Sequence, residues 1–248
     1  MKISTDGLII KEQNIGEQNR LVTALTKSHG IIRAFVRNAR SIKSPKGSAT
    51  RLLCYSRLTI FIGRDTYTID EAQSQEMFVS LRTDIVKMSL AQYFCELALA
   101  FAPENLPAEE YLRLFLNGLY VLSREKRPRG LVKAAVELRL LSIAGYMPDL
   151  MCCNGCQCYA HENMFFLPQS GILLCGDCIQ GREKYGILLG MGVTTAMRHC
   201  IYAPFEKLFG FTLPEPSVAL LEQASEAYVL HVSERVFKTL DFYKTIQN

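Results

Sequence analysis

The sequence predicts a multidomain α+β protein, in which a small N-terminal β-barrel precedes an α-helical domain that carries an inserted cysteine-rich module. Three observations support this. Short β-rich segments fill the first 80 residues, a helical apolar period begins near residue 84, and two CxxC pairs follow residue 149. The expected domains are therefore 1–80, 81–148, 149–181 and 182–248, of which the second and fourth form one helical domain.

The barrel is predicted from short runs of β-branched and aromatic residues separated by turns. These runs are 7–10, 21–26, 31–36, 58–62 and 66–69. Gly63-Arg64-Asp65 has the length of a hairpin connection between the last two runs. Because no helix-length pattern lies among them, a small closed barrel or a sandwich is expected.

The helical domain is predicted from apolar residues at helical spacing. The expected helices are about 85–101, 109–122, 131–144 and 194–202, and the segment 217–246 is long enough for two helices or one bent one. Pro103 and Pro107 end the first helix, Glu109 and Glu110 suit the start of the second, and Gly145 ends the third.

Positive charge is concentrated in the barrel segment. Between Gln18 and Arg64 the chain has ten Lys or Arg residues and no Asp or Glu, although the formal net charge of the whole chain is only +4. If this segment folds into a surface of one sign, it attracts polyanions such as nucleic-acid backbones. The alternative is an ordinary basic face that keeps the protein in solution.

Four of the nine cysteines have the spacing of a structural zinc site. They are Cys153, Cys156, Cys175 and Cys178, in the pattern Cys-x2-Cys-x18-Cys-x2-Cys. Cys152 could pair with Cys156 in a looser arrangement, but the two matched spacings favour Cys153. Four thiolate ligands leave no open position, so the expected Zn²⁺ is architectural. The isolated Cys54, Cys95 and Cys200 are expected to be buried, inert thiols.

The sequence contains no pattern typical of an enzyme. It has no phosphate-binding GxxxxGK[ST] loop, no histidine placed as in a metalloprotease, and no carboxylate cluster of the kind that two-metal nucleases need. Its apolar runs are too short to span a bilayer or to form a signal-peptide core. We therefore expect a cytoplasmic binding protein that is not an enzyme and does not use a membrane.

Three blocks of residues together match the pattern of one known protein family. The first block is Glu137 to Leu141, followed by Gly145, Pro148, Leu150, Cys153 and Cys156. The second is Gly7 to Ile10, Gly16-Glu17, Leu21 to Thr26 and Gly30, then Phe35 to Arg40, which is similar to the family's basic Lys-Gly-Ala-Arg element. In that element Arg37 and Asn38 replace Lys and Gly, and Asn tolerates a left-handed backbone. The third block, Arg235 with Lys238 to Leu240, is weaker.

Taken together, these blocks resemble the RecO family of bacterial DNA-repair proteins. The resemblance implies an N-terminal OB-fold and a recombination mediator. Such a protein binds single- and double-stranded DNA, anneals complementary strands, and catalyses no reaction. The implied partners are RecR and the acidic C-terminal tail of single-strand-binding protein, and indirectly RecA and possibly RecF. The implied location is the bacterial nucleoid.

On this basis a DNA-binding face is expected on the barrel. Its predicted residues are Arg33, Arg37, Arg40, Lys43, Lys46, Arg51, Arg57, Tyr55 and Tyr67. The two tyrosines are expected to stack on bases, whereas strand alternation favours Phe35 and Phe61 as barrel core. A basic loop is expected over the groove at residues 39–47.

A second basic cluster is open to two interpretations. Its residues are Arg124, Lys126, Arg127, Arg129, Lys133 and Arg139. It could extend the DNA track or receive the acidic tail, or it could be an exposed loop between helices.

Three other functions compete with a mediator. A zinc-ribbon factor in transcription or translation would prefer a specific duplex or a structured RNA. A nuclease or another DNA-processing enzyme would turn over its substrate in a reaction that depends on a divalent metal. A structural subunit would not bind DNA in a salt-dependent manner.

Overall fold

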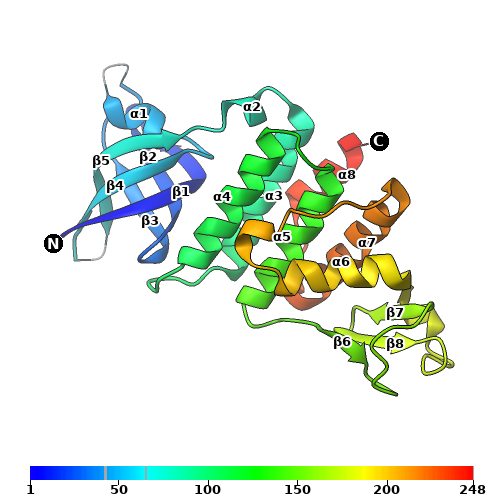
Figure 1. The fold of residues 1–248 in the computed structure, drawn as a ribbon. Coiled ribbons are helices and arrows are strands. Elements are labelled where there is room, and N and C mark those ends of the chain that lie inside the picture. Colours follow the sequence, from blue (N-terminus) through cyan, green and yellow to red (C-terminus); the bar gives the residue numbers. More distant parts are fainter. Residues whose placement is uncertain (42–43, 65, 248) are drawn as a thin grey trace. The chain divides into compact units, whose positions relative to one another are not determined.

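The computed structural model describes residues 1–41, 44–64 and 66–247, and Figure 1 shows its elements. The chain forms two compact units. One contains residues up to Ser123 together with the C-terminal segment from Phe237, and the other is Arg124–Val236.

The first unit contains a closed five-stranded barrel with the strand order β1-β2-β3-β5-β4. The strands are β1 (Lys2–Ile15), β2 (Asn19–Thr26), β3 (Gly30–Val36), β4 (Tyr55–Ile62) and β5 (Tyr67–Glu76). All neighbours are antiparallel except β3 and β5, and the short helix α1 (Pro45–Ala49) lies between β3 and β4. This is the topology of an OB-fold, so the predicted barrel is confirmed.

Strict alternation along β3 separates the barrel core from its outer surface. Ile32, Ala34 and Val36 are buried inside, and the intervening Arg33 and Phe35 are exposed. The buried core of the barrel comprises Ile9, Val22, Ala24, Ile32, Ala34, Val36, Ala39, Leu58, Ile60 and Ile69. Side chains of a strand point alternately to its two sides, so every outward residue of β3 can meet solvent or a ligand.

Strands β1 and β2 differ from β3 because both of their faces are buried in part. Leu8, Ile9 and Ile10 are all buried. Ile9 belongs to the barrel core, whereas Leu8 and Ile10 pack against Phe94 and Phe115 without leaving a water-sized cavity. These aromatic residues come from α3 (Ile85–Phe101) and α4 (Glu109–Ser123). The helices therefore cover one side of the barrel and leave Arg33 and Phe35 of β3 exposed.

The segment between α3 and α4 docks on the turn that precedes β3. Ile31 donates its backbone N–H to Pro103 O (2.8 Å), and Ala108 donates to Lys27 O (3.0 Å). Gly30 has φ +60°, and a Cβ there would lie 2.0 Å from Pro103 O. Only glycine fits both the left-handed backbone and this close approach.

The predicted helices are present with small changes in their ends. The first unit also contains α2 (Val79–Arg82) and α8 (Lys238–Gln247), and the second contains α5 (Arg129–Ile143), α6 (Gly190–Tyr202) and α7 (Glu215–Ser233). Asp84 caps α3, accepting hydrogen bonds from the N–H groups of Val86 and Lys87. The segment 217–246 is thus two helices, and its second half packs on α3.

The second unit combines its three helices with a small sheet of order β6-β8-β7-β9. The strands are β6 (Asp149–Cys153), β7 (Met164–Leu167), β8 (Ile172–Cys175) and β9 (Ile187–Leu188), and short 3-10 turns lie at Glu183–Tyr185 and Phe205–Lys207. A buried ion cluster joins α5 to α7. In it, the fully buried Lys133 Nζ lies 3.0 Å from Glu137 Oε1 and 2.9 Å from Glu226 Oε2.

This cluster corrects part of the sequence interpretation. Lys133 and Arg139 were expected in a second basic surface, but both are buried. Arg139 donates to the carbonyls of Cys200 and Ala203, and Arg127 donates to Phe209 O at 2.7 Å. Three of the six basic residues therefore serve the fold of the helical unit, because burying a charge requires such partners.

Candidate nucleic-acid interface and metal centre

The open side of the barrel carries two exposed phenylalanines in one cross-strand row. Thr68 on β5 is the register partner of both Phe35 on β3 and Phe61 on β4. Phe35 is 39% exposed and Phe61 is 46% exposed. Neighbouring strands lie about 4.8 Å apart, so the two ring positions are about 10 Å apart. The expectation that Phe35 and Phe61 are core residues is therefore wrong. The alternation was read correctly, but the side facing the core was assigned incorrectly.

A recess of about 260 Å³ lies beside Phe35. Its other lining residues are Ile15, Asn19, Val36, Arg37, Thr66 and Thr68. They come from the ends of β1 and β2 beside their connecting turn, from the end of β3 and the residue after it, and from the β4–β5 connection and the start of β5. OB-folds bind oligonucleotides at this place, between strands 2–3 and these two connections.

The turn after β3 is fastened to the turn between β1 and β2. Asn38 donates its backbone N–H to Asn19 Oδ1 (3.1 Å), and Arg40 Nη1 donates to Gly16 O (3.4 Å). Asn38 has φ +55°, the left-handed backbone expected for this position. These contacts fix the turn that carries Arg37, which lines the recess, and Arg40.

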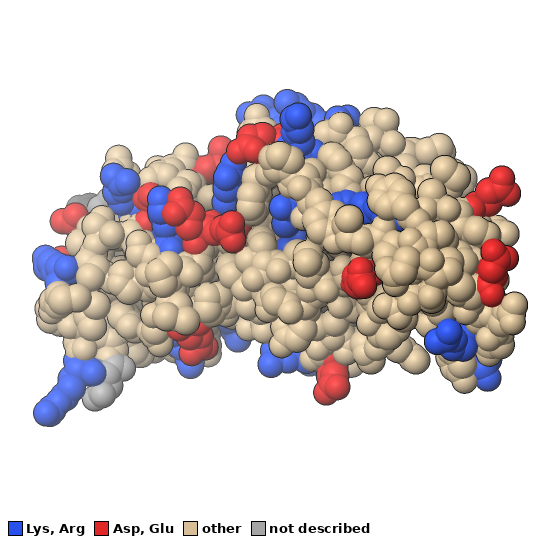
Figure 2. All heavy atoms as spheres, turned by 60° about the horizontal axis from the view of Figure 1, so that its bottom comes forward, with Lys and Arg blue, Asp and Glu red and all other residues tan. Residues whose placement is uncertain are grey.

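The basic segment does not form a surface of one sign, contrary to the sequence-based expectation. Its cations meet carboxylates from β1: Arg57 Nε lies 3.1 Å from Asp6 Oδ1, and Arg51 Nε lies 3.5 Å from Glu12 Oε1. Arg20 is buried, also beside Glu12, and donates to Gly47 O and Thr50 Oγ1. Figure 2 shows one face of the molecule, on which basic and acidic side chains are interspersed.

Arg33 and Arg37 keep their charges available. Neither forms an ion pair with another residue in the part of the chain that the structure describes. Both belong to the outward row of β3 and its continuation, as Phe35 does. The candidate interface therefore comprises the surface of β3, the turn that follows it, and Phe61 on β4.

The other predicted DNA-binding residues lie in different surroundings. Lys43 lies outside the described residues. Lys46 is half-buried in α1, so the expected basic loop at 39–47 contains the start of a helix. Tyr67 is half-buried against the barrel core, and its hydroxyl donates to Asn105 Oδ1 (3.1 Å). Tyr55 is half-buried, and this burial raises the pKa of its hydroxyl. That these two tyrosines stack on bases stays a prediction.

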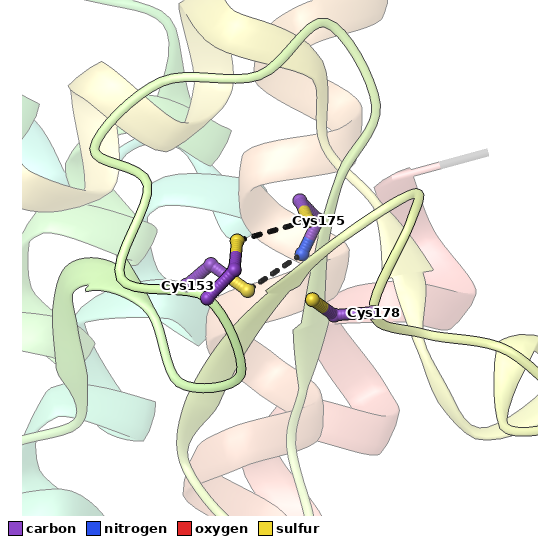
Figure 3. A group of neighbouring side chains, drawn as sticks. Cys153, Cys175 and Cys178 are labelled. Carbon is purple, nitrogen blue, oxygen red and sulfur yellow. Dashed lines mark hydrogen bonds between the residues drawn. The ribbon is translucent and has the colours of Figure 1, made fainter.

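The four predicted cysteines converge at one end of the small sheet. Their sulfur atoms all lie within 4.8 Å of one another, and Figure 3 shows Cys153, Cys175 and Cys178 pointing toward a common centre. Cys153 ends β6 and Cys175 ends β8, and both are buried. The cluster can hold a metal ion. Cys152 is outside it and donates to Gln157 Oε1 instead, so the tighter of the two expected pairings is the observed one.

Backbone N–H groups favour the thiolate form at Cys153. Cys175 and Gly155 donate to Cys153 Sγ at 3.2 and 3.4 Å. Burial raises the pKa of Cys153, but three backbone N–H donors outweigh it and lower this pKa to about 6. Gly155 is required here, because a Cβ would lie 2.9 Å from Cys178 Sγ. A deprotonated sulfur is the form that binds metal.

Arg198 on α6 holds the backbone next to the cluster, a role that sequence reasoning missed. It donates to Leu150 O (2.6 Å) and Tyr159 O (2.7 Å), and its guanidinium lies 4.1 Å from the centre of the Tyr159 ring. A single arginine inside a helical pattern gives no signal of such a role. The three isolated cysteines are buried as expected: they are Cys54, Cys95 and Cys200, and burial raises the pKa of Cys95 and Cys200 to about 12.

Comparison with known proteins matches both parts of this architecture. Residues 1–78 match the family model of the recombination protein O N terminus, and residues 82–241 match that of its C terminus. The chain belongs to the RecO family of DNA repair and recombination proteins. It is 32% identical to the DNA repair protein RecO of Acetivibrio thermocellus, over 98% of this chain and 97% of that protein. Identity to the RecO protein of Symbiobacterium thermophilum is 30%, over 99% and 98% of the two chains.

Membership of this family confirms the resemblance seen in the sequence. It also removes the support for a zinc-ribbon factor of transcription or translation. None of the helices in the described part of the chain is both long and apolar enough to cross a membrane.

Proposed function

We propose that this protein binds DNA strands on the open side of its barrel and acts as a recombination mediator. The observation that carries the proposal is the row of exposed Phe35 and Phe61 beside the unpaired charges of Arg33 and Arg37. OB-folds bind single strands by stacking bases on aromatic rings and by holding phosphates with cations. Neither contact distinguishes one base sequence from another in a marked way.

Annealing follows from the same surface. Two DNA strands repel each other through their phosphates, and cations that hold both strands lower this repulsion. The protein would thus bring complementary strands together without nucleotide hydrolysis, which agrees with a family of mediators that are not enzymes. Duplex DNA would bind to the same cations through its backbone.

We further propose that the cysteine cluster binds Zn²⁺ and that the ion is architectural. Zn–S bonds of about 2.3 Å imply tetrahedral S–S edges of about 3.8 Å. The separation of 3.6 Å between Cys156 Sγ and Cys175 Sγ is close to that value. The ion would keep a small module folded that has little core of its own.

The proposed partners are those of the family. RecR and the acidic tail of single-strand-binding protein would act with this chain to replace that protein by RecA on single strands, with RecF as a possible further participant. Binding to chromosomal DNA would place the protein at the nucleoid in the cytoplasm.

The test is annealing of two dye-labelled complementary strands, each coated with single-strand-binding protein, in the absence of nucleotide and added magnesium. Rapid annealing that weakens with increasing salt supports the proposal. Replacing Arg37 and Arg40 together by Glu should lower both affinity and annealing while the fold survives, because both side chains are exposed. A folded double variant with unchanged affinity would show that DNA binds elsewhere.

A further inference from the structure

A second recess adjoins the proposed DNA-binding row. It has a volume of about 250 Å³ and lies where β1, β2 and β3 face the end of α3. Leu21, Thr23 and Ile31 line it from the strands, and its remaining lining residues are Lys11, Gln13, Arg33, Leu99 and Glu104. Arg33 of this recess precedes Phe35 of the other by two residues on β3, so these two lining residues are about 7 Å apart along the strand.

The recess is lined by charges of both signs. Lys11 and Arg33 supply two cations, and Glu104 supplies one carboxylate. Among the described residues, none of the three forms an ion pair with another residue. The position of Glu104 is fixed by its backbone, which forms β-bridges with Gly30 and Ile31. Its carboxylate therefore remains available to a ligand.

We propose that this recess receives one unpaired nucleobase of single-stranded DNA, and that Glu104 favours bases that carry an amino group. The proposal rests on the DNA-binding function proposed above. Lys11 and Arg33 would hold the flanking phosphates, and the apolar part of the recess would contact the face of the base. The volume is below the roughly 300 Å³ at which pockets for drug-sized ligands begin, which suits a single base.

The carboxylate accounts for the selectivity. A Glu oxygen accepts a hydrogen bond from the amino group N4 of cytosine, whereas thymine presents a carbonyl oxygen at the same place. The same carboxylate repels a phosphate, so the base rather than the backbone enters the recess. In duplex DNA the base is stacked and paired inside the helix and cannot enter the recess, which therefore favours single strands.

An acidic peptide is the other ligand class that two cations and an apolar floor could attract. Glu104 disfavours it, because like charges at close range repel in a partly buried site. A base is not repelled by the carboxylate, and its amino group can donate a hydrogen bond to it.

The experiment compares the affinities of dye-labelled oligo-dC and oligo-dT, each of about twelve nucleotides, which is within the site size of one OB-fold. Both are measured by fluorescence anisotropy at the same salt concentration. Oligo-dC should bind about three- to tenfold more tightly than oligo-dT, a modest value for one charged acceptor. The variant Glu104→Gln should bring the two affinities together, mainly by tightening oligo-dT, because the amide donates as well as accepts. The matched control Glu71→Gln, at an exposed carboxylate of β5 outside the recess, should leave the ratio unchanged.

The outcomes separate this inference from the proposed function. If both oligomers bind with equal affinity and that affinity depends on Arg37, the DNA-binding function stands and the base-selective recess is wrong. If neither oligomer binds, both proposals fail. If an aspartate-rich peptide displaces oligo-dC and binds more tightly to the Glu104→Gln variant, the recess is a peptide site and the nucleobase assignment is overturned.

Discussion

The barrel and the cysteine module are both built from short strands, but with the Zn²⁺ proposed above different forces would hold them together. The barrel closes its five strands around an apolar core that contains Leu58 and Ile60. The module has four strands of two to five residues, and four cysteine sulfurs meet at its end. A segment this small buries too little apolar surface to fold on its own.

This difference determines which exposed residues can change without loss of the fold. In the barrel, outward residues such as Phe35 contribute little to the core, so evolution can use them for binding. In the module the exposed Cys156 is as important as the buried Cys153, because both provide a sulfur to the same cluster. Exposure therefore has opposite meanings in the two regions.

The largest effect that we predict is the loss of the module on metal removal. A strong chelator, or the substitution Cys175→Ser, should raise amide hydrogen exchange across residues 149–188 and leave the barrel protected. Structural zinc contributes on the order of 10 kcal/mol in small zinc-dependent domains. Hydrogen exchange resolved by peptide mass spectrometry, with the zinc content measured in parallel, tests this.

Cys152→Ser is the matched control, because Cys152 is adjacent to the cluster but outside it. It should retain both metal and protection. Unchanged exchange after chelation would mean that the module is held by its contacts with α6, for example through Arg198, and not by a metal.

A smaller effect is expected from two neighbouring residues on β4. Ile60→Ala should lower the free energy of unfolding by about 3 kcal/mol, because it leaves a cavity in the barrel core. Phe61→Ala should change it by less than about 1 kcal/mol, because this ring is on the outside. Urea unfolding, monitored by tyrosine fluorescence, measures both free energies of unfolding. Similar losses for the two variants would contradict the assignment of inner and outer faces.

Much of the fold could be predicted because its signals are local. The β-branched runs, the helical period and the CxxC spacings each depend on neighbouring residues. The inner and outer sides of the barrel were harder to assign, because alternation along β3 or β4 is the same whichever side faces inward. The consecutive apolar residues Leu8, Ile9 and Ile10 did carry information, since a strand buried on both faces reads in this way. Here these residues indicate that α3 and α4 cover one side of the barrel.

The charge pattern was misread for a related reason. Carboxylates are absent from residues 18–64 of the chain, but Asp6 and Glu12 on β1 are brought beside that segment by strand pairing. A count along the sequence cannot include such partners. Arg20 illustrates this, because its buried guanidinium lies 3.5 Å from the carboxylate of Glu12, which is outside that segment.

The smallest effect that we predict concerns the two exposed rings. Phe35→Ala and Phe61→Ala should each weaken binding of single-stranded DNA by about tenfold, because stacking contributes about 1–3 kcal/mol per base. The dependence of affinity on salt should stay the same in both variants, whereas Arg37→Ala should reduce that salt slope by about one unit. Phe242→Ala, at an exposed ring on α8, is the control that should leave affinity unchanged. If the Phe35 and Phe61 variants bind like the unaltered protein while Tyr67→Ala does not, the stacking surface lies at the half-buried tyrosines, and the exposed row only marks the open side of the barrel.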